Sequence, residues 1–222
     1  ERRLHHAEFS GAGSCNSDRG RAQARDGMTS MSMKSPVSPA NTGVWVGIAA
    51  ITMSFAAYSS ALIVRQGANP DWQHFTLPRI LFFNTLVVLA SSVTLYIARP
   101  RTPATVDRSG TVTVVDAPHL KWLYVTIVLG FLFLIGQVVA WRNLVDQGIT
   151  LASGPSSSFF YLLTAMHGLH LLGGLAGLVY VVYRVRGSTT ERAVRAFGAA
   201  SLYWHFMTVL WVYLFALLAT RI

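Results

Sequence analysis

Residues 158–174 have the sequence SFFYLLTAMHGLHLLGG, and residues 203–211 have the sequence YWHFMTVLW. Both stretches lie in apolar segments of about 20 residues, the length that a helix needs to cross a bilayer. They contain three histidines and no acidic residue. A histidine at membrane depth is costly, so it is usually held by a partner such as haem, a metal, a lipid headgroup or another helix. These stretches therefore predict membrane helices and supply the first candidate site residues.

The composition indicates an integral membrane protein. Of the 222 residues, 52% are hydrophobic and only 12% are charged, whereas an ordinary soluble domain is about 25% charged. The apolar segments are continuous rather than alternating, so they predict helices and not the strands of a membrane barrel. We expect residues 43–222 to form an all-α integral membrane bundle of five transmembrane helices, over Gly43–Val64, Pro78–Ala98, His119–Trp141, Ser158–Tyr183 and Phe197–Ala219.

The N-terminal segment, residues 1–42, is a different kind of sequence. It is mostly polar, rich in Gly, Ser and Arg, and without hydrophobic periodicity, so we expect a disordered tail. The tail holds the single cysteine, Cys15, so we expect no internal disulfide and no cysteine-ligated metal centre. If translation starts later, the residues before the start would not belong to the protein; the candidate starts are Met28, Met31 and Met33.

The net charge of +9 follows membrane topology rather than nucleic-acid binding. With the N-terminus in the cytoplasm, fourteen of the eighteen Lys and Arg residues lie on the cytoplasmic side, and the other four are Arg65, Arg79, Arg142 and Arg221. Because basic residues favour the cytoplasmic side, we expect a multi-pass protein with a cytoplasmic N-terminus and an external C-terminus. The basic charge then contacts anionic lipid, and we expect no nucleic-acid partner.

Polar and small residues within the spans lie on helical stripes. His167, His170, Gly174 and Gly177 share one face, and Gly173 with Gly177 makes a GxxxG pair that allows another helix to approach closely. The simplest interpretation is helix packing with hydrogen-bonded polar side chains. The candidate packing residues are Gly173, Gly174, Gly177, Asn84 and Gln137. The candidates for lipid binding or a structural role are His167, His170, Trp204, His205 and Trp211.

The three histidines do not suit a two-haem site, because His167 and His170 lie on one helix and cannot flank one iron. A three-histidine copper or zinc site is conceivable, but the spans contain no carboxylate to orient such ligands. We therefore expect no catalytic residue, no bound cofactor and no metal in this chain. The lack of intramembrane carboxylates and of mid-helix prolines also argues against an ion pump or a transporter.

Four motifs on consecutive spans carry a family resemblance. They are PRILFFNTLVVLASSVTL (78–95), GFLFLIGQVVAW (130–141), FFYLLTAMHGLHLLGGLAGL (159–178) and YWHFMTVLWVYLF (203–215). In this order they resemble the motifs of subunit III of the haem-copper respiratory oxidases. The length of five spans is similar to the bacterial short forms, which lack the first two helices of the seven-span type.

The resemblance implies a non-catalytic accessory subunit of a proton-pumping cytochrome c or quinol oxidase in aerobic respiration. Members of this family bind no haem or copper, which the catalytic partner subunits carry. They pack beside subunit I, hold phospholipids in a V-shaped cleft and help to sustain proton uptake. The implied partners are therefore subunit I, subunit II and membrane phospholipids, and the implied location is the bacterial inner membrane.

Two positions depart from the family pattern. The family commonly has an acidic residue near Ile51 or Thr52 and an aspartate at Thr208, so the proton-related roles of those carboxylates do not carry over. Two alternatives stay open: the related accessory subunit of a nitric oxide reductase, and an independent haem or metal membrane oxidoreductase. The sequence does not decide between cytochrome c and quinol as electron donor, because that site lies on another subunit.

Overall fold

The computed structural model describes residues 39–68, 72, 78–99, 105–106, 112–113, 119–187 and 191–221. The chain divides into two units, Glu1–Ser38 and Pro39–Ile222, and every described element belongs to the second unit. The predicted tail, residues 1–42, lies outside the described residues except for its last four positions, so its disorder stays a prediction.

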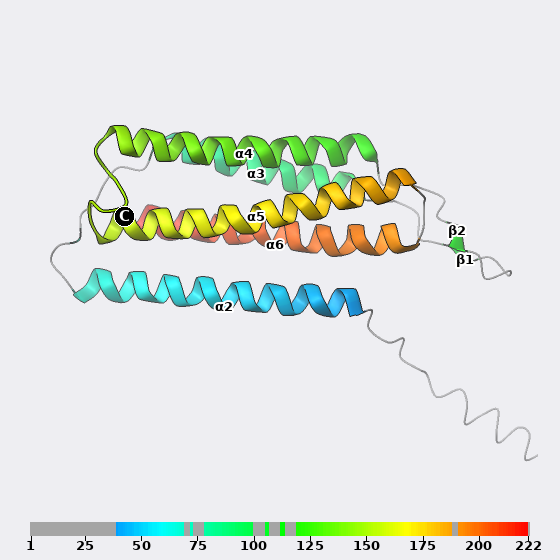
Figure 1. Cartoon of the computed structure of the whole chain (residues 1–222), viewed down its shortest axis with the longest axis horizontal. Coiled ribbons are helices and arrows are strands. Elements are labelled where there is room, and N and C mark those ends of the chain that lie inside the picture. Colours follow the sequence, from blue (N-terminus) through cyan, green and yellow to red (C-terminus); the bar gives the residue numbers. More distant parts are fainter. Residues whose placement is uncertain are drawn as a thin grey trace, which may run out of the picture. The chain divides into compact units, whose positions relative to one another are not determined.

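Five long helices make up most of the described part of the second unit (Figure 1). They are α2 (Pro39–Ala68), α3 (Ile80–Ile97), α4 (Leu120–Asp146), α5 (Pro155–Gly187) and α6 (Glu191–Arg221). All five are long and apolar enough to cross a membrane. They alternate in direction, so that the start of α2 lies at the same end of the bundle as the ends of α3 and α5. The predicted all-α bundle of five transmembrane helices is confirmed.

A pair of two-residue strands lies in the connector between α3 and α4. β1 (Thr105–Val106) pairs with β2 (Val112–Thr113) in antiparallel orientation. The connector also contains prolines and a glycine, which punctuate regular structure and favour turns. So short a pair does not change the fold class.

The helices extend beyond the predicted spans, as the end of α4 illustrates. α4 continues past Trp141 to Asp146, and Gly148 then has a positive φ of 79°. The N–H of Ile149 donates to the carbonyl of Leu144 at 2.9 Å, which is the pairing of a Schellman cap with a left-handed glycine. Apolarity marks only the part of a helix inside the hydrocarbon, so it does not locate turns that continue into the interface.

The helices pack around α6, which contacts α2, α3 and α5. The most extensive pair is α3 with α4, and α4 also contacts α5, while α2 packs against α5 and α6. Five large aromatic side chains are fully buried in the core: Trp204, Trp211, Phe55, Phe133 and Phe160. Three of the spans that carry the sequence motifs thus supply aromatic side chains to this core.

The connection after α2 ties this helix to the end of α6. Gln66 Nε2 donates to the carbonyl of Arg221 at 3.3 Å, and Trp72 Nε1 donates to the same oxygen at 2.9 Å. The last carbonyls of a helix lack partners within the helix. These two side chains therefore cap α6 and hold the C-terminal end of α2 beside it.

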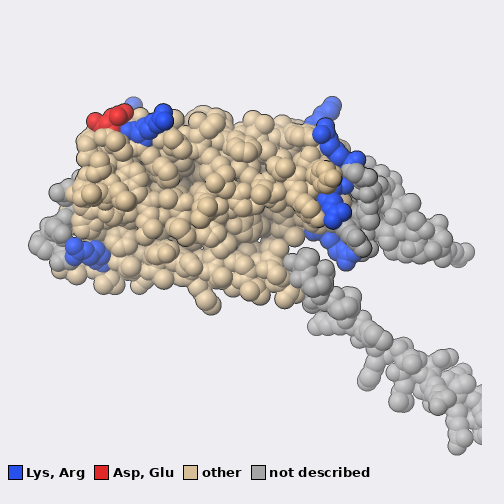
Figure 2. All heavy atoms as spheres, viewed as in Figure 1, with Lys and Arg blue, Asp and Glu red and all other residues tan. Residues whose placement is uncertain are grey.

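Charged side chains gather at the two ends of the helices, and the described surface between them carries no charged side chain on the face drawn in Figure 2. We use "basic end" for the end where α3 and α5 terminate, which has the described cations Arg99, Lys121, Arg184, Arg186 and Arg195. The opposite end carries Asp146 as well as the cations Arg65, Arg79, Arg142 and Arg221. This distribution is typical of helices that span a bilayer, where charged side chains are costly at membrane depth.

Candidate functional site

The seam between α3 and α6 is joined by three side-chain hydrogen bonds at two levels. Trp204 Nε1 donates to Ser91 Oγ at 3.1 Å. Trp211 Nε1 donates to Thr85 Oγ1 at 3.1 Å, two turns further along α6. Ser92 Oγ lies 2.6 Å from His205 Nδ1. Since hydrocarbon offers no hydrogen-bond partner, such bonds hold membrane helices in one register. The motif residues Trp204, His205 and Trp211 therefore bind α6 to α3.

The seam between α3 and α4 is polar as well. Asn84 Nδ2 donates to Gln137 Oε1 at 3.1 Å, and the hydroxyls of Thr94 and Thr126 lie 2.8 Å apart. The Asn84 amide lies directly on Gly136, so that a Cβ at Gly136 would meet Asn84 Cγ at 2.7 Å. The glycine thus makes room for the buried amide pair, which explains why α3 and α4 come so close.

His167 is enclosed between α4 and α6. Its side chain is 0% exposed, and neither ring nitrogen has a hydrogen-bond partner among the described residues. Its ring centroid lies 5.0 Å from that of Trp211 and 5.9 Å from that of Phe133. The contacts of this histidine within the chain are therefore aromatic packing contacts.

His170, one turn later on α5, faces a different neighbour. Its Nδ1 lies 2.7 Å from the carbonyl of Met166, and its ring packs edge-on against Phe55 of α2 at 5.8 Å. His167, His170 and His205 thus lie in three different seams and form no common donor set. Among the described residues, no group of three His, Cys, Asp or Glu side chains is placed to hold a metal ion.

The glycines of α5 lie in two different surroundings. A Cβ at Gly174 would meet the Tyr203 ring at 3.1 Å, so this glycine accommodates a side chain of α6. A Cβ at Gly173 or Gly177 would meet nothing within 4 Å. No helix among the described residues therefore packs closely on Gly173 or Gly177. Their predicted helix-packing role stays a prediction, and it would require a molecule outside this chain.

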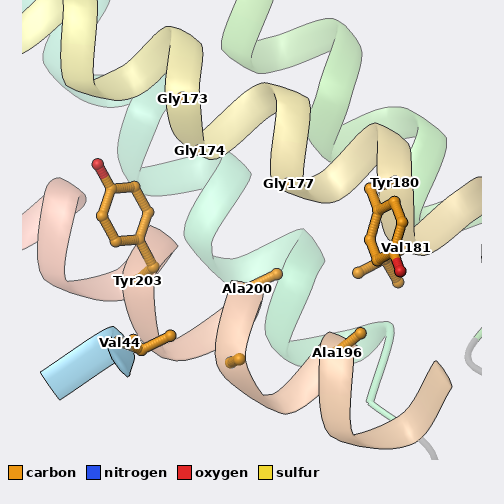
Figure 3. A pocket seen from close by; sticks show the side chains of 10 residues that line it. Val44, Gly173, Gly174, Gly177, Tyr180, Val181, Ala196, Ala200 and Tyr203 are labelled. Carbon is orange, nitrogen blue, oxygen red and sulfur yellow. The ribbon is translucent and has the colours of Figure 1, made fainter. Parts of the chain in front are cut away.

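Gly173 and Gly177 line an open groove of about 450 Å³ between α5, α6 and the start of α2 (Figure 3). Alanines of α6 form its other wall, among them Ala196 and Ala200. Tyr203 and Tyr180 border it, and the Tyr180 hydroxyl accepts a hydrogen bond of 2.8 Å from Arg184 Nε. We call this the α5–α6 groove. Its lining is mostly small and apolar, and the guanidinium of Arg184 lies beside Tyr180 at its border.

A second hollow of about 360 Å³ follows the seam between α4 and α5. Trp141 Nε1 donates to Thr164 Oγ1 across this seam at 3.1 Å. Gln137 also lines it, and its Nε2 has no hydrogen-bond partner among the described residues. We call this the α4–α5 groove.

A family model described as cytochrome c oxidase subunit III matches residues 50–220. The chain belongs to the cytochrome c oxidase subunit III family. The match begins within α2 and ends one residue before the end of α6, so it takes in nearly all of the membrane bundle. It confirms the resemblance that the four sequence motifs carried.

Named relatives agree with this assignment to the subunit III family. The chain is 35% identical to the probable cytochrome c oxidase subunit 3 of Mycobacterium tuberculosis over 99 residues, which are 44% of this chain and 49% of that protein. It is 29% identical to the cytochrome c oxidase subunit 3 of Synechocystis over 181 residues, 79% of this chain and 72% of the relative. The subunit of Alkalihalophilus pseudofirmus is 27% identical over 179 residues, with shares of 78% and 82%. The chain spans about half the length of the first curated relatives it matches.

Thr52 and Thr208, two positions where the sequence resemblance led us to expect a carboxylate, have hydroxyls that bond within their own helices. Thr52 Oγ1 donates to the carbonyl of Ile48 at 2.8 Å, and Thr208 Oγ1 donates to that of Trp204 at 3.1 Å. Both bonds stay within one helix.

Several residues that complete these seams of subunit III were not predicted from the sequence. Thr85 and Thr164 accept the indole N–H bonds, and Gly136 accommodates Asn84. The sequence offered a partial signal, because Thr85 and Thr164 lie within the quoted motifs. Helical periodicity groups residues by face, however, and does not say which residue of the next helix each will meet.

Proposed function

We propose that this chain is the non-catalytic accessory subunit of a haem-copper terminal oxidase, and that it assembles beside subunits I and II in aerobic respiration. The main support is that residues of the family motifs join the helices of this chain to one another. Asn84, Trp204 and Trp211 all bond to neighbouring helices, so the motifs hold the bundle together. A bundle organised in this way supplies a docking surface for catalytic subunits rather than a reaction centre.

The haem and copper of the complex are expected in the partner subunits. A haem iron in a helical bundle is held by ligands on opposite sides of the ring. His167 and His170 lie on one helix with different neighbours, Trp211 and Phe55, and the third histidine, His205, lies beside Ser92. This donor set does not fit a haem or a three-histidine metal centre.

We further propose that the α5–α6 groove holds a phospholipid. Glycines and alanines form an apolar channel that an acyl chain fits, and Arg184 lies beside Tyr180 where an anionic headgroup would lie. Basic residues near a membrane surface attract anionic lipids by about 1 kcal/mol each. The resemblance to subunit III also supports this proposal, because it implies phospholipids held in a V-shaped cleft.

Support for proton uptake is proposed to be indirect. The five spans contain one acidic residue, Asp146, and it is the last residue of α4. Proton relays through membranes generally need chains of Asp, Glu or His side chains at membrane depth. The three histidines of these spans lie in three different seams and form no such chain. This subunit would therefore sustain the turnover of subunit I by stabilising it and its lipids, without carrying protons itself.

We place the protein in the bacterial inner membrane with its basic end in the cytoplasm. The support is the excess of Lys and Arg in the segments at that end of the bundle. Reporter fusions before residue 43 and at residue 222 should then report the cytoplasm and the exterior respectively. Two reports from the same side would contradict both the orientation and the odd number of spans.

The decisive experiment is purification of the tagged chain from its native membrane in mild detergent. We expect mass spectrometry to identify oxidase subunits I and II, and the visible spectrum of haem to remain with subunit I when the tagged chain is removed. The depleted oxidase should start at an unchanged rate and lose activity faster during turnover. Recovery of nitric oxide reductase subunits would favour the first alternative, and a haem band in the isolated chain would favour the second.

A further inference from the structure

A polar cluster lies along the outer side of the seam between α3 and α6, near the basic end. Ser92 and His205 meet there, with Ser92 Oγ 2.6 Å from His205 Nδ1, and both side chains are partly exposed. Tyr96 and Arg99 follow Ser92 after four and seven residues, so the three lie on one face of α3. Tyr96 and Arg99 are exposed, so the cluster is open to the surroundings of the bundle.

The hydrogen bond to Ser92 determines which nitrogen of His205 carries the proton. Among the described residues, the His205 ring is the only hydrogen-bond partner of the Ser92 hydroxyl, so this hydroxyl donates to Nδ1. The imidazole then carries its hydrogen on Nε2, a tautomer assigned from the hydrogen bonds. Nε2 has no partner in the described part of the chain and, unlike both nitrogens of His167, it is not enclosed. The ring therefore presents a reachable N–H donor that lacks an acceptor.

Arg99 brings a positive charge to the same cluster. Its guanidinium carbon lies 5.9 Å from the centroid of the Tyr96 ring, so the side chain turns back along α3 by one turn. In this position its charge acts on the His205 ring. Asp146, the one acidic residue whose side chain the structure describes, lies at the opposite end of the bundle. Within the described residues, Arg99 thus has an aromatic partner and no counter-ion.

The level of the cluster in the bilayer restricts what can supply the missing acceptor. Tyrosine and arginine at the end of a spanning helix lie at the level of the lipid headgroups, and Tyr96 and Arg99 lie at the end of α3. Ser92 lies one turn deeper than Tyr96, which is about 6 Å, and the headgroup region is about 5–8 Å deep on each side. The His205 donor therefore lies near the glycerol ester carbonyls, and the guanidinium lies near the phosphates. One glycerophospholipid carries both of these acceptors.

We propose that Arg99, Tyr96 and His205 form a binding site for an anionic glycerophospholipid. The lipid phosphate pairs with Arg99, which Tyr96 holds in place, and an ester carbonyl accepts a hydrogen bond from His205 Nε2. Ser92 positions the imidazole and keeps the hydrogen on Nε2. The site is separate from the α5–α6 groove, since none of its residues lines that groove. It goes beyond the proposed function, because it depends on no partner subunit.

A matched pair of variants tests the hydrogen bond to the lipid. His205→Phe and Ser92→Ala both remove the bond between α3 and α6, but only His205→Phe removes the Nε2–H donor. Native mass spectrometry of the full chain should show binding of dioleoyl phosphatidylglycerol about 3- to 20-fold weaker for His205→Phe than for Ser92→Ala, the range of single hydrogen bonds in membranes. The diether analogue lacks the ester carbonyl and should bind both variants equally. Equal binding of the ester lipid, or an equal loss with the diether, would overturn the inference.

The two variants are made in a Gly177→Leu chain, so that lipid in the α5–α6 groove does not obscure the comparison. If that groove holds no lipid, this background leaves the difference between His205→Phe and Ser92→Ala unchanged. The proposed function and the present inference can therefore fail separately.

Arg99→Gln tests the charge of the site on a side chain that is exposed and outside the core. It should weaken the binding of phosphatidylglycerol about 5-fold, with ester and diether lipid alike, because one basic residue near the surface contributes an attraction of this order. Arg79→Gln is the matched control, since Arg79 is also exposed but lies at the other end of α3, and it should leave binding unchanged. No loss for Arg99→Gln, or the same loss for both variants, would overturn the site.

Photo-cross-linking identifies the occupant in the assembled complex. A benzoylphenylalanine at Val93, which is 58% exposed and lies one turn from Tyr96 on α3, should form adducts with phospholipid. Adducts with a peptide of another subunit, and none with lipid, would assign the cluster to a protein contact and overturn the inference.

Discussion

Two sets of glycines in this bundle have opposite surroundings. At Gly136 and Gly130 an added Cβ would collide with Asn84 and with the Trp204 ring, the latter at 2.7 Å. At Gly173 and Gly177 it would meet nothing within 4 Å. We use "closed side" for the α3–α4–α6 packing around the first pair, and "open side" for the α5–α6 groove around the second pair.

This difference in surroundings indicates whether the group that packs on each glycine belongs to the same chain or to another molecule. In a membrane, packing and interhelical hydrogen bonds drive helix association, because lipid is as apolar as the side chains. On the closed side the space above a glycine is used by another helix of the same chain. On the open side it is available to a lipid or to a neighbouring subunit. Identical substitutions on the two sides should therefore have different consequences.

The largest effect is expected for Gly136→Leu. The new side chain would displace the buried Asn84 amide and separate α3 from α4, at a cost of about 2–4 kcal/mol from overpacking and the lost buried hydrogen bond. The midpoint of thermal or SDS unfolding of the purified chain measures this. Gly173→Leu is the control, and it should leave that midpoint unchanged or slightly higher, because leucine also favours helix. Equal losses for both variants would remove the distinction between the two sides.

The next effect is expected for His167→Ala, which leaves a cavity beside Trp211 and Phe133. The expected cost in unfolding free energy is about 2–3 kcal/mol, near the lower end for large-to-small core substitutions. His167→Phe keeps an aromatic ring beside Trp211 and Phe133, and it removes two nitrogens that have no partner among the described residues. The phenyl ring is larger than the imidazole, which adds some overpacking, so the loss of stability should be smaller than for His167→Ala but not zero. If His167→Phe proved as damaging as His167→Ala, the site would require the smaller imidazole ring and not merely an aromatic side chain.

A smaller effect is expected for Trp204→Phe. It removes the indole N–H bond to Ser91 and part of the contact with Gly130, at a cost of about 1–2 kcal/mol. A double-mutant cycle with Ser91→Ala isolates the hydrogen bond. The coupling should be about 0.6 kcal/mol and at most about 1.7 kcal/mol, the range for interhelical bonds in membranes. A coupling of zero would mean that Trp204 acts through packing alone.

The closed side was largely predictable from the sequence. Continuous apolarity predicted the number and order of the helices, and the polar residues within the spans marked Asn84 and Gln137 as candidate packing residues. Such residues are costly in hydrocarbon unless they are paired, so the stripes had to face other helices. The bonding pairs, such as Trp211 with Thr85, could not be predicted, because the rotation of one helix against the next depends on tertiary packing.

The open side was predictable only as a pattern. The sequence showed the GxxxG pair of Gly173 and Gly177 but not what approaches it, since the same pattern serves internal packing and external docking. The alanines opposite, Ala196 and Ala200, became part of the groove only when α6 folded back along α5. The cap at Gly148 was missed for a related reason, because a helix end in the interface has no apolar signal.

The smallest effect on the stability of the chain is expected for Gly177→Leu, which should nevertheless reduce the amount of bound lipid. The leucine would project into the α5–α6 groove, where a Cβ at this position meets no atom of the described residues within 4 Å, so the unfolding midpoint of the isolated chain should not fall. It would, however, occupy the space assigned to an acyl chain, and lipid analysis of the washed complex should show at least one fewer retained phospholipid per subunit. Gly198→Leu is the matched control, since Gly198 lies on α6 with nothing within 4 Å and outside the groove. If both variants retained the same lipid but Gly177→Leu released the subunit from the oxidase, the open side would be occupied by a neighbouring subunit rather than by lipid.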